Sequence, residues 1–373
     1  MLGLGGTGIA GAVTAAAAAA GPASTPTAYV VANNGGPPGS GTVTPISTAT
    51  NKPGTAIPVG KGPQSIAITP NGKTAYVVNF GGGAVGGDTV TPIRTATNTA
   101  LTPVRVGRFP DAIAITPNGA TAYVANGGSG TVTPISTATG KPGTPIKVGK
   151  APGYIAITPD GKTAYVSNGR SGTVTPISTA TGKPGTAIKV GKNPAAIAIT
   201  PNGATAYVSN EGSGTVTPIS TATGKPGKPI TVSNPASSPP GQIAITPNGK
   251  TAYVVITAIV GAGSVGVVPI QTATNRPGKP IPLGLFPFRI AITPNGKTAY
   301  ATSDSGLTPI NTATNTPGKA IKGLSGPIAI TPDGTTVYAG SSNHSVTPVS
   351  TATNTPSKAI TVGSDPVAIA ITP

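Results

Sequence analysis

Short runs of alternating apolar and polar residues fill most of this chain, and turn-forming residues separate them. The unit at 151–191 is typical, because its runs are rich in Val, Ile, Tyr and Thr, which favour strands. Asp160-Gly161 follows the first run, and an Asp-Gly pair favours a tight hairpin. The unit predicts four short antiparallel strands, at 154–159, 162–168, 173–179 and 186–190.

The unit recurs along the chain. The segment Ile-Ala-Ile-Thr-Pro occurs eight times at intervals of 38 to 47 residues, starting at Ile66, Ile113, Ile155, Ile197, Ile243, Ile290, Ile328 and Ile369. A Tyr-centred segment interleaves with it at Tyr29, Tyr76, Tyr123, Tyr165, Tyr207, Tyr253, Tyr300 and Tyr338. The first Tyr segment has no Ile-Ala-Ile-Thr-Pro before it, and the last Ile-Ala-Ile-Thr-Pro has no Tyr segment after it. The two are halves of one repeat.

Repeats of this length with four strands each predict an all-β fold, a β-propeller with eight four-stranded blades. Seven blades is the alternative, because the interval from Ile290 to Ile328 is only 38 residues. We expect the ring to close by pairing of the C-terminal strand with the N-terminal blade, which removes an unpaired inner edge. Residues 24–373 then form one propeller domain.

A proline in the third strand of every unit conflicts with a regular four-stranded ladder. Proline cannot donate a ladder hydrogen bond and is normally confined to edges or bulges. We therefore expect the outermost strand to be short or bulged beside it. The prolines are Pro45, Pro92, Pro134, Pro176, Pro218, Pro269, Pro309 and Pro348.

The Tyr segments read Tyr76-Val-Val-Asn79, Tyr123-Val-Ala-Asn126, Tyr165-Val-Ser-Asn168 and Tyr207-Val-Ser-Asn210. Together with the Thr-Pro-(Asn/Asp)-Gly-Lys and Thr-Ala-Thr-Asn motifs, they resemble the repeats of YVTN-family β-propellers. The resemblance covers residues 26–373. It implies kinship with propeller groups that include WD40-like domains, lactonases and the haem-binding domain of cd1-type nitrite reductases.

The composition limits the kinds of catalytic, metal and binding site that the chain can form. The formal net charge is +17, from 24 Lys and Arg against 7 Asp and Glu, and predicts attraction to anionic surfaces. The absence of Cys excludes thiol catalysis, and a single His, His344, excludes a multi-histidine metal site. We expect neither a metal nor a cofactor. Aromatic residues make up only 3% of the chain, which does not favour base stacking.

Residues 1–23 carry no charged side chain and include an unbroken alanine run at 15–20. This pattern resembles the apolar part of a secretory signal peptide without its basic start, and a disordered Ala-rich segment is the alternative. A permanent membrane anchor is not expected, because Gly and Ala are weakly apolar. The segment predicts a secreted or cell-envelope protein.

Basic residues recur in the loops that lead from one unit to the next, as in Val-Gly-Lys150-Ala-Pro. If these loops surround a channel mouth, their side chains form a partial cationic ring that binds polyanions in a salt-dependent way. Solvated turn residues are the alternative, which basic turns on the opposite face at Lys52, Lys141, Lys183, Lys225 and Arg276 favour. The candidate polyanion-binding residues are Lys61, Arg108, Lys150, Lys192, Arg289 and Lys322.

Acidic residues and the one histidine also fall in the expected mouth loops. The lactonase resemblance implies carboxylates around a metal, but each of these residues comes from a different loop, and scattered surface acids are the alternative. The candidate catalytic residues are Asp111, Glu211, Asp304, His344 and Asp365.

These observations predict an exported, monomeric, non-enzymatic propeller that binds or scaffolds, with an anionic wall polymer, a nucleic-acid backbone or a protein as its partner. A lactonase- or lyase-like enzyme and a surface-layer structural protein are the alternatives. Because the units are so alike, we expect any specific site where they differ: after Phe80, at 233–241, at 256–263 and around Asp304.

Overall fold

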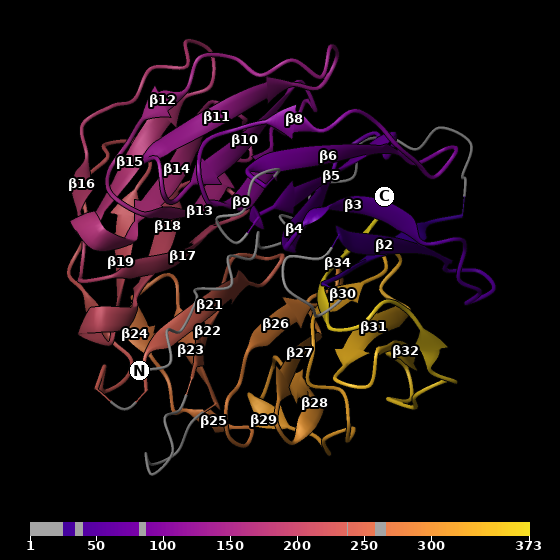
Figure 1. Ribbon diagram of the computed structural model, residues 1–373. Helices are drawn as coiled ribbons and strands as arrows, with labels where there is room; N and C mark the ends of the chain where they lie inside the picture. Colours follow the sequence, from indigo (N-terminus) through magenta and orange to yellow (C-terminus); the bar gives the residue numbers. More distant parts are fainter. Residues whose placement is uncertain (1–24, 34–39, 82–86, 237, 258–265) are drawn as a thin grey trace.

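The computed structural model describes residues 25–373 except 34–39, 82–86, 237 and 258–265. The expected signal segment at 1–23 lies outside these residues. Eight antiparallel sheets form a ring, so the fold is the expected eight-bladed β-propeller and the seven-bladed alternative is wrong (Figure 1). No helix in the described ranges is long and apolar enough to cross a membrane.

The innermost strand of each blade lines the centre of the ring, and the second strand pairs with it. In blades 1 to 8 the innermost strands are β34 (Pro366–Ile371), β4 (Pro63–Ile68), β9 (Pro110–Ile115), β13 (Pro152–Ile157), β17 (Pro194–Ile199), β21 (Pro240–Ile245), β26 (Arg289–Ile292) and β30 (Ile328–Ile330). The second strands are β1 (Thr27–Ala32), β5 (Thr74–Asn79), β10 (Thr121–Asn126), β14 (Thr163–Asn168), β18 (Thr205–Asn210), β22 (Thr251–Ile256), β27 (Thr298–Ser303) and β31 (Thr336–Ser341).

The third and outer strands complete each blade. The third strands are β2 (Ser40–Ser47), β6 (Thr89–Arg94), β11 (Thr131–Ser136), β15 (Thr173–Ser178), β19 (Thr215–Ser220), β23 (Gly266–Gln271), β28 (Gly306–Asn311) and β32 (Ser345–Ser350). The outer strands are β3 (Ile57–Lys61), β7 (Thr99–Ala100) with β8 (Val104–Arg105), β12 (Ile146–Lys147), β16 (Ile188–Lys189), β20 (Ile230–Thr231), β24 (Arg276–Pro277) with β25 (Ile281–Pro282), β29 (Thr316–Pro317) and β33 (Ile360–Thr361). Two 3-10 turns, η2 (Gly169–Ser171) and η3 (Glu211–Ser213), follow second strands.

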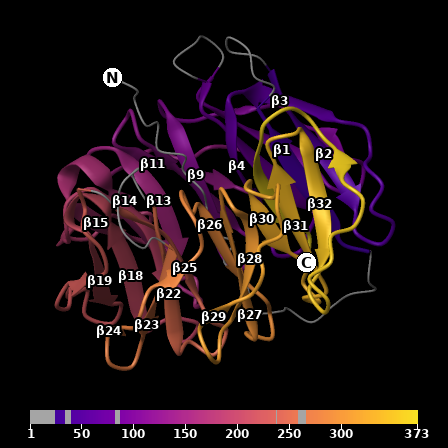
Figure 2. The same ribbon diagram turned by 90° about the horizontal axis from the view of Figure 1, so that it is seen from below.

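The ring closes as expected. The C-terminal strand β34 pairs antiparallel with β1, with Ala28 opposite Ile371 and Val30 opposite Ile369. Figures 1 and 2 show the last blade, in yellow, beside the first, in indigo. Blade 1 therefore takes its inner strand from one end of the chain and its other strands from the opposite end.

The proline of the third strand explains the short outer strand. In blade 3, Pro134 lies opposite Tyr123, and its carbonyl accepts a hydrogen bond from the amide of Gly143 in the outer turn at 2.7 Å. Alternate residues of a strand direct their backbone groups to opposite sides, so the missing amide of Pro134 faces the outer turn, not β10. The outer strand β12 pairs only with Thr131 and Val132, beyond the proline.

The apolar core lies between neighbouring blades. One cluster joins Tyr123 and Val132 of blade 3 to Ile155 and Val166 of blade 4, and similar clusters fill the other junctions. Each blade is therefore apolar on both faces.

The buried tyrosines add a polar contact to each of several junctions. The hydroxyl of Tyr300 donates to Asn354 Oδ1 in the next blade at 2.7 Å. Asn354 has a φ of +56°, in the left-handed region that Asn and Gly tolerate. At the turn equivalent to Asn354, Tyr165 instead finds Gly224, with a φ of +66°, and its hydroxyl donates to the carbonyl of Thr221 at 3.4 Å. The Thr-Ala-Thr-Asn motif thus supplies both the turn and the tyrosine's acceptor.

Removing the hydroxyl of Tyr300 should destabilise the ring. Tyr300→Phe removes the 2.7 Å bond to Asn354, and we expect a loss of about 1 kcal/mol in the free energy of unfolding, measured by urea denaturation. Tyr165→Phe is the matched control and should cost less, because its only bond is long. Equal costs for the two variants would contradict this account of the motif.

Removing residues 366–373 should open the ring. Without β34, strand β1 presents an unpaired inner edge, and exposed edges promote association. We expect the truncated chain to self-associate and to unfold at lower urea, as measured by light scattering and denaturation. Removing Pro373 alone, which lies outside β34, should change neither property. A truncated chain that stays monomeric with an unchanged midpoint would refute the role of closure.

Candidate functional site

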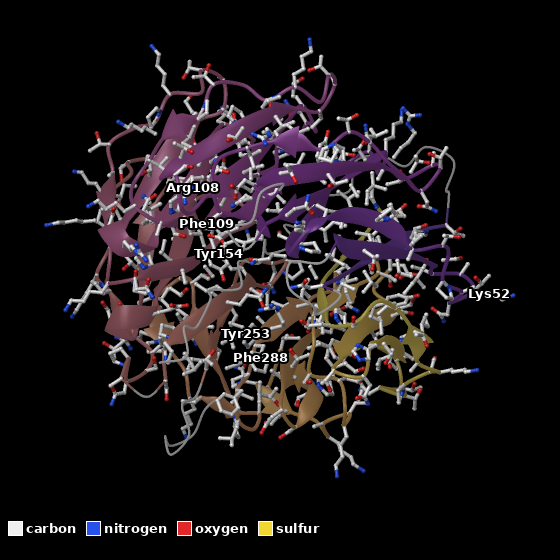
Figure 3. All side chains as sticks on the ribbon, viewed as in Figure 1. Lys52, Arg108, Phe109, Tyr154, Tyr253 and Phe288 are labelled. Atoms are coloured by element: carbon white, nitrogen blue, oxygen red, sulfur yellow. The ribbon has the colours of Figure 1, made fainter. Side chains whose placement is uncertain are left out.

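The loops between blades and the loops between second and third strands share one face of the ring, which we call the loop face. Backbone hydrogen bonds join the two kinds of loop, from Gly128 to Arg108 at 2.9 Å and from Gly212 to Lys192 at 3.0 Å. The loop face carries most of the residues that the sequence marked as candidates, and Figure 3 labels Arg108 and Phe109 there.

The asparagine that ends the second strand shapes the basic loops. Asn168 is fully buried, and its amide donates to the hydroxyls of Thr173 and Thr175. Its Oδ1 accepts from the amide of Gly149 at 3.0 Å, in the loop that enters the blade. Asn126 and Asn210 make the same contacts with Gly107 and Gly191. The Tyr-Val-x-Asn motif therefore positions the loop that carries the basic residue.

A second contact completes each loop. The backbone amide of Lys150 donates to Ser171 Oγ at 2.8 Å, and Arg108 and Lys192 make equivalent bonds at 2.7 Å. The Lys150 side chain is exposed, and the next residue, Ala151, has a φ of +52°. These fixed turns hold exposed cations at repeated positions.

The expected cationic ring is only an arc. Arg108, Lys150 and Lys192 occupy equivalent loops before blades 3 to 5, and Lys61, the last residue of β3, holds the same place in the repeat before blade 2. The strand register places the other two candidates, Arg289 and Lys322, outside these loops. Leu285 takes the basic position before blade 7, and Arg289 lies in the inner strand β26. Lys322 follows Ile321, which bridges to Leu307 as Ile146 pairs with Val132, so Lys322 belongs to the outer edge.

Aromatic contacts reinforce the arc at Arg108. The rings of Phe80 and Phe109 stack with centroids 5.2 Å apart, and the Arg108 guanidinium lies 5.4 Å from the Phe109 centroid. Asp88 Oδ1 accepts from the backbone amide of Phe109 at 2.8 Å. These contacts fix the loop and leave Arg108 exposed.

A basic groove, which the sequence analysis did not predict, lies between blades 2 and 3 away from the loop face. Its lining includes Lys73, Arg94, Arg105 and Lys141 together with the partly exposed Leu101. The basic residues come from different strands and turns, so their spacing along the chain gives no signal of the groove.

The candidate catalytic residues do not form a common centre. The described residues contain no group of three or more His, Asp and Glu side chains placed to hold a metal ion. Glu211, in η3, accepts from Asn193 Nδ2 at 2.7 Å, and burial raises its pKa. Asp304 lies between β27 and β28, His344 between β31 and β32, and Asp365 before β34, and all three are exposed.

Asp111 differs from the other acids. It lies in the inner strand β9, half-buried, with Oδ2 against the space that a Cβ on Gly127 would occupy. Its carboxylate makes no hydrogen bond and no ion pair with any described residue. Burial raises the pKa of Asp111 to about 7, which is the range of a general acid or base.

No protein-family model matches the chain, and no curated protein sequence matches it. Solved structures do. Hydrazine synthase of Kuenenia stuttgartiensis is 25% identical with a TM-score of 0.64, over 78% of this chain and 96% of that chain.

Two further solved structures share the fold. The dihydro-heme d1 dehydrogenase NirN, in complex with DHE, is 14% identical with a TM-score of 0.73, over 90% of this chain and 73% of that one. Apo AztD of Citrobacter koseri is 12% identical with a TM-score of 0.67, over 93% of this chain and 97% of that one. The likenesses show a β-propeller fold whose known members have different roles.

The pKa of Asp111 predicts how stability depends on pH. The folded carboxyl holds its proton to about pH 7, above the ordinary value of 3.8, so stability falls as pH rises between these values. Asp111→Asn should therefore stabilise the protein at pH 8, by about 1–3 kcal/mol after allowance for partial solvation, and change little at pH 3. Thermal denaturation at both pH values measures this. Asp365→Asn, at an exposed site, is the control, and equal effects of the two variants would contradict the prediction.

Proposed function

We propose that this protein is an exported repeat propeller of the YVTN type and a non-enzymatic binding or scaffold module for anionic polymers of the cell envelope. The observation that carries the proposal is the unpaired positive charge. All 24 basic and all seven acidic residues lie in the described ranges, yet only Lys162 and Asp160 form an ion pair, at 3.7 Å on the surface.

Two surfaces concentrate this charge. The arc of Lys61, Arg108, Lys150 and Lys192 repeats one cation per blade over four successive blades. The basic groove adds four more cations between blades 2 and 3. A polymer with regularly spaced phosphates matches repeated, rigidly held cations without needing sequence readout.

The rigid turns support a scaffold role. Fixed loops lose little conformational entropy when a ligand binds, so even weak single contacts add up along a polymer. The basic residues on the turns of the opposite face, such as the exposed Lys52, add a diffuse field (Figure 3).

Binding to a phosphate-rich wall polymer, measured across a salt series, tests the proposal. We expect log K to fall linearly with log salt concentration, with a slope of about −0.9 for each phosphate contacted. Lys150→Gln with Lys192→Gln should reduce the slope if the polymer follows the arc. Arg94→Gln with Arg105→Gln should do so if it follows the groove.

The control pair, Lys319→Gln with Lys358→Gln, removes the same charge from exposed turns of blades 7 and 8. Its plot of log K against log salt concentration should stay steeper than that of the double variant that removes the polymer contacts. Absence of binding at low salt, or binding that is indifferent to salt, would overturn the proposal.

A further inference from the structure

Arg289 is the one basic residue that the fold carries into the centre of the ring. It is the first residue of β26, the inner strand of blade 7, two residues after Pro287. The side chain is only partly exposed, and its Nε is fully enclosed without a hydrogen-bond partner among the described residues. Its Nη1 makes one long bond, 3.4 Å, to the carbonyl of Phe288.

The chain supplies no counterion for this guanidinium. All seven acidic residues are described, and none lies within ion-pair distance of Arg289. The C-terminal Pro373 packs beside the turn at Gly72, on the face opposite the loops. Burial lowers the pKa of Arg289 to about 10, so the group keeps its charge at neutral pH.

The neighbours of Arg289 place it in the central channel. It interacts electrostatically with Tyr154, which belongs to the inner strand of blade 4. Blades 5 and 6 stand between the two residues on the channel wall, so this interaction acts across the opening. Figure 3 labels Tyr154 on the inner side of the ring.

Gln242 of blade 6 adds a hydrogen-bond donor to this part of the channel. Its Oε1 accepts from the amide of Ile290 at 2.8 Å, which holds the side chain against blade 7. Its Nε2 donates to none of the described residues. Tyr154, Gln242 and Arg289 all occupy the position before the first Ile of Ile-Ala-Ile, where the other inner strands have Ser65, Ala112, Ala196, Pro327 and Ala368.

A guanidinium with an enclosed, unpaired Nε and no counterion is destabilised, and a bound anion would offset that cost. We propose that the channel binds one small oxyanion, a carboxylate or a phosphate group, on the guanidinium of Arg289, with Tyr154 and Gln242 beside it. A guanidinium presents paired N–H donors that match two oxygens of such a group. This site goes beyond the polymer-binding surfaces and is independent of them.

Calorimetric titration of the full chain with inorganic phosphate, and separately with succinate, at constant ionic strength in chloride buffer tests the site. We expect saturable binding of one ion per chain by at least one of the two probes. The probe that binds identifies the group as phosphate or carboxylate, and binding of both shows that the site recognises the oxyanion charge alone.

Arg289→Met keeps the length of the side chain without its charge and should weaken binding at least tenfold. Arg289→Lys keeps the charge without the paired N–H donors of the guanidinium. It should bind the anion more weakly than the native chain but more tightly than Arg289→Met. Arg276→Gln, at an exposed position of β24, is the charge-matched control and should bind like the native chain.

Absence of saturable binding by the native chain, or native affinity in both Arg289 variants, would overturn the proposal. The double variant Lys150→Gln with Lys192→Gln should bind the small anion normally. Loss of polymer binding and loss of small-anion binding are therefore distinguishable.

Discussion

Each blade of this propeller is apolar on both faces, and that constraint organises the molecule. A sheet with two apolar faces needs two covering neighbours, and a closed ring provides both for every blade without a separate core. Closure is consequently as important as any blade, because it gives blades 1 and 8 their second neighbour. The pairing of β34 with β1 achieves it. The buried tyrosines then fix adjacent blades to each other through turns whose asparagine has positive φ.

Much of this architecture could be predicted from the residues. The period-2 runs, the eight Ile-Ala-Ile-Thr-Pro segments and the orphan half-repeats predict the blade count and the closure, because strand periodicity is local and the repeat count leaves two halves to pair. The proline at Pro134 even predicts a short outer strand. The roles of Asn168 and Asn354 could not be predicted, since they depend on loops that the fold brings from other units.

The candidate sites were less predictable for the same reason. The Val-Gly-Lys-x-Pro pattern places Lys150 and Lys192 correctly in loops, but the pattern changes before blades 7 and 8, where Leu285 takes the basic position and Lys322 moves to an outer edge. Residue spacing does not reveal that Tyr154 and Arg289, three blades apart, interact electrostatically across the channel. Specific sites were expected where the units differ. Two of those variable segments, after Phe80 and at 256–263, lie largely outside the described residues.

Asp111 and Arg289 show two responses to the same physical problem, a charged group largely enclosed by protein without a counterion. A carboxyl can become neutral by taking a proton, and burial raises the pKa of Asp111 to about 7, so the group does this near neutral pH. A guanidinium with a pKa of about 10 cannot lose its proton under the same conditions. The acid therefore needs only a change of protonation, whereas the base needs an anion. Because none of the seven acidic residues pairs with Arg289, the anion proposed for the channel would supply the missing counterion.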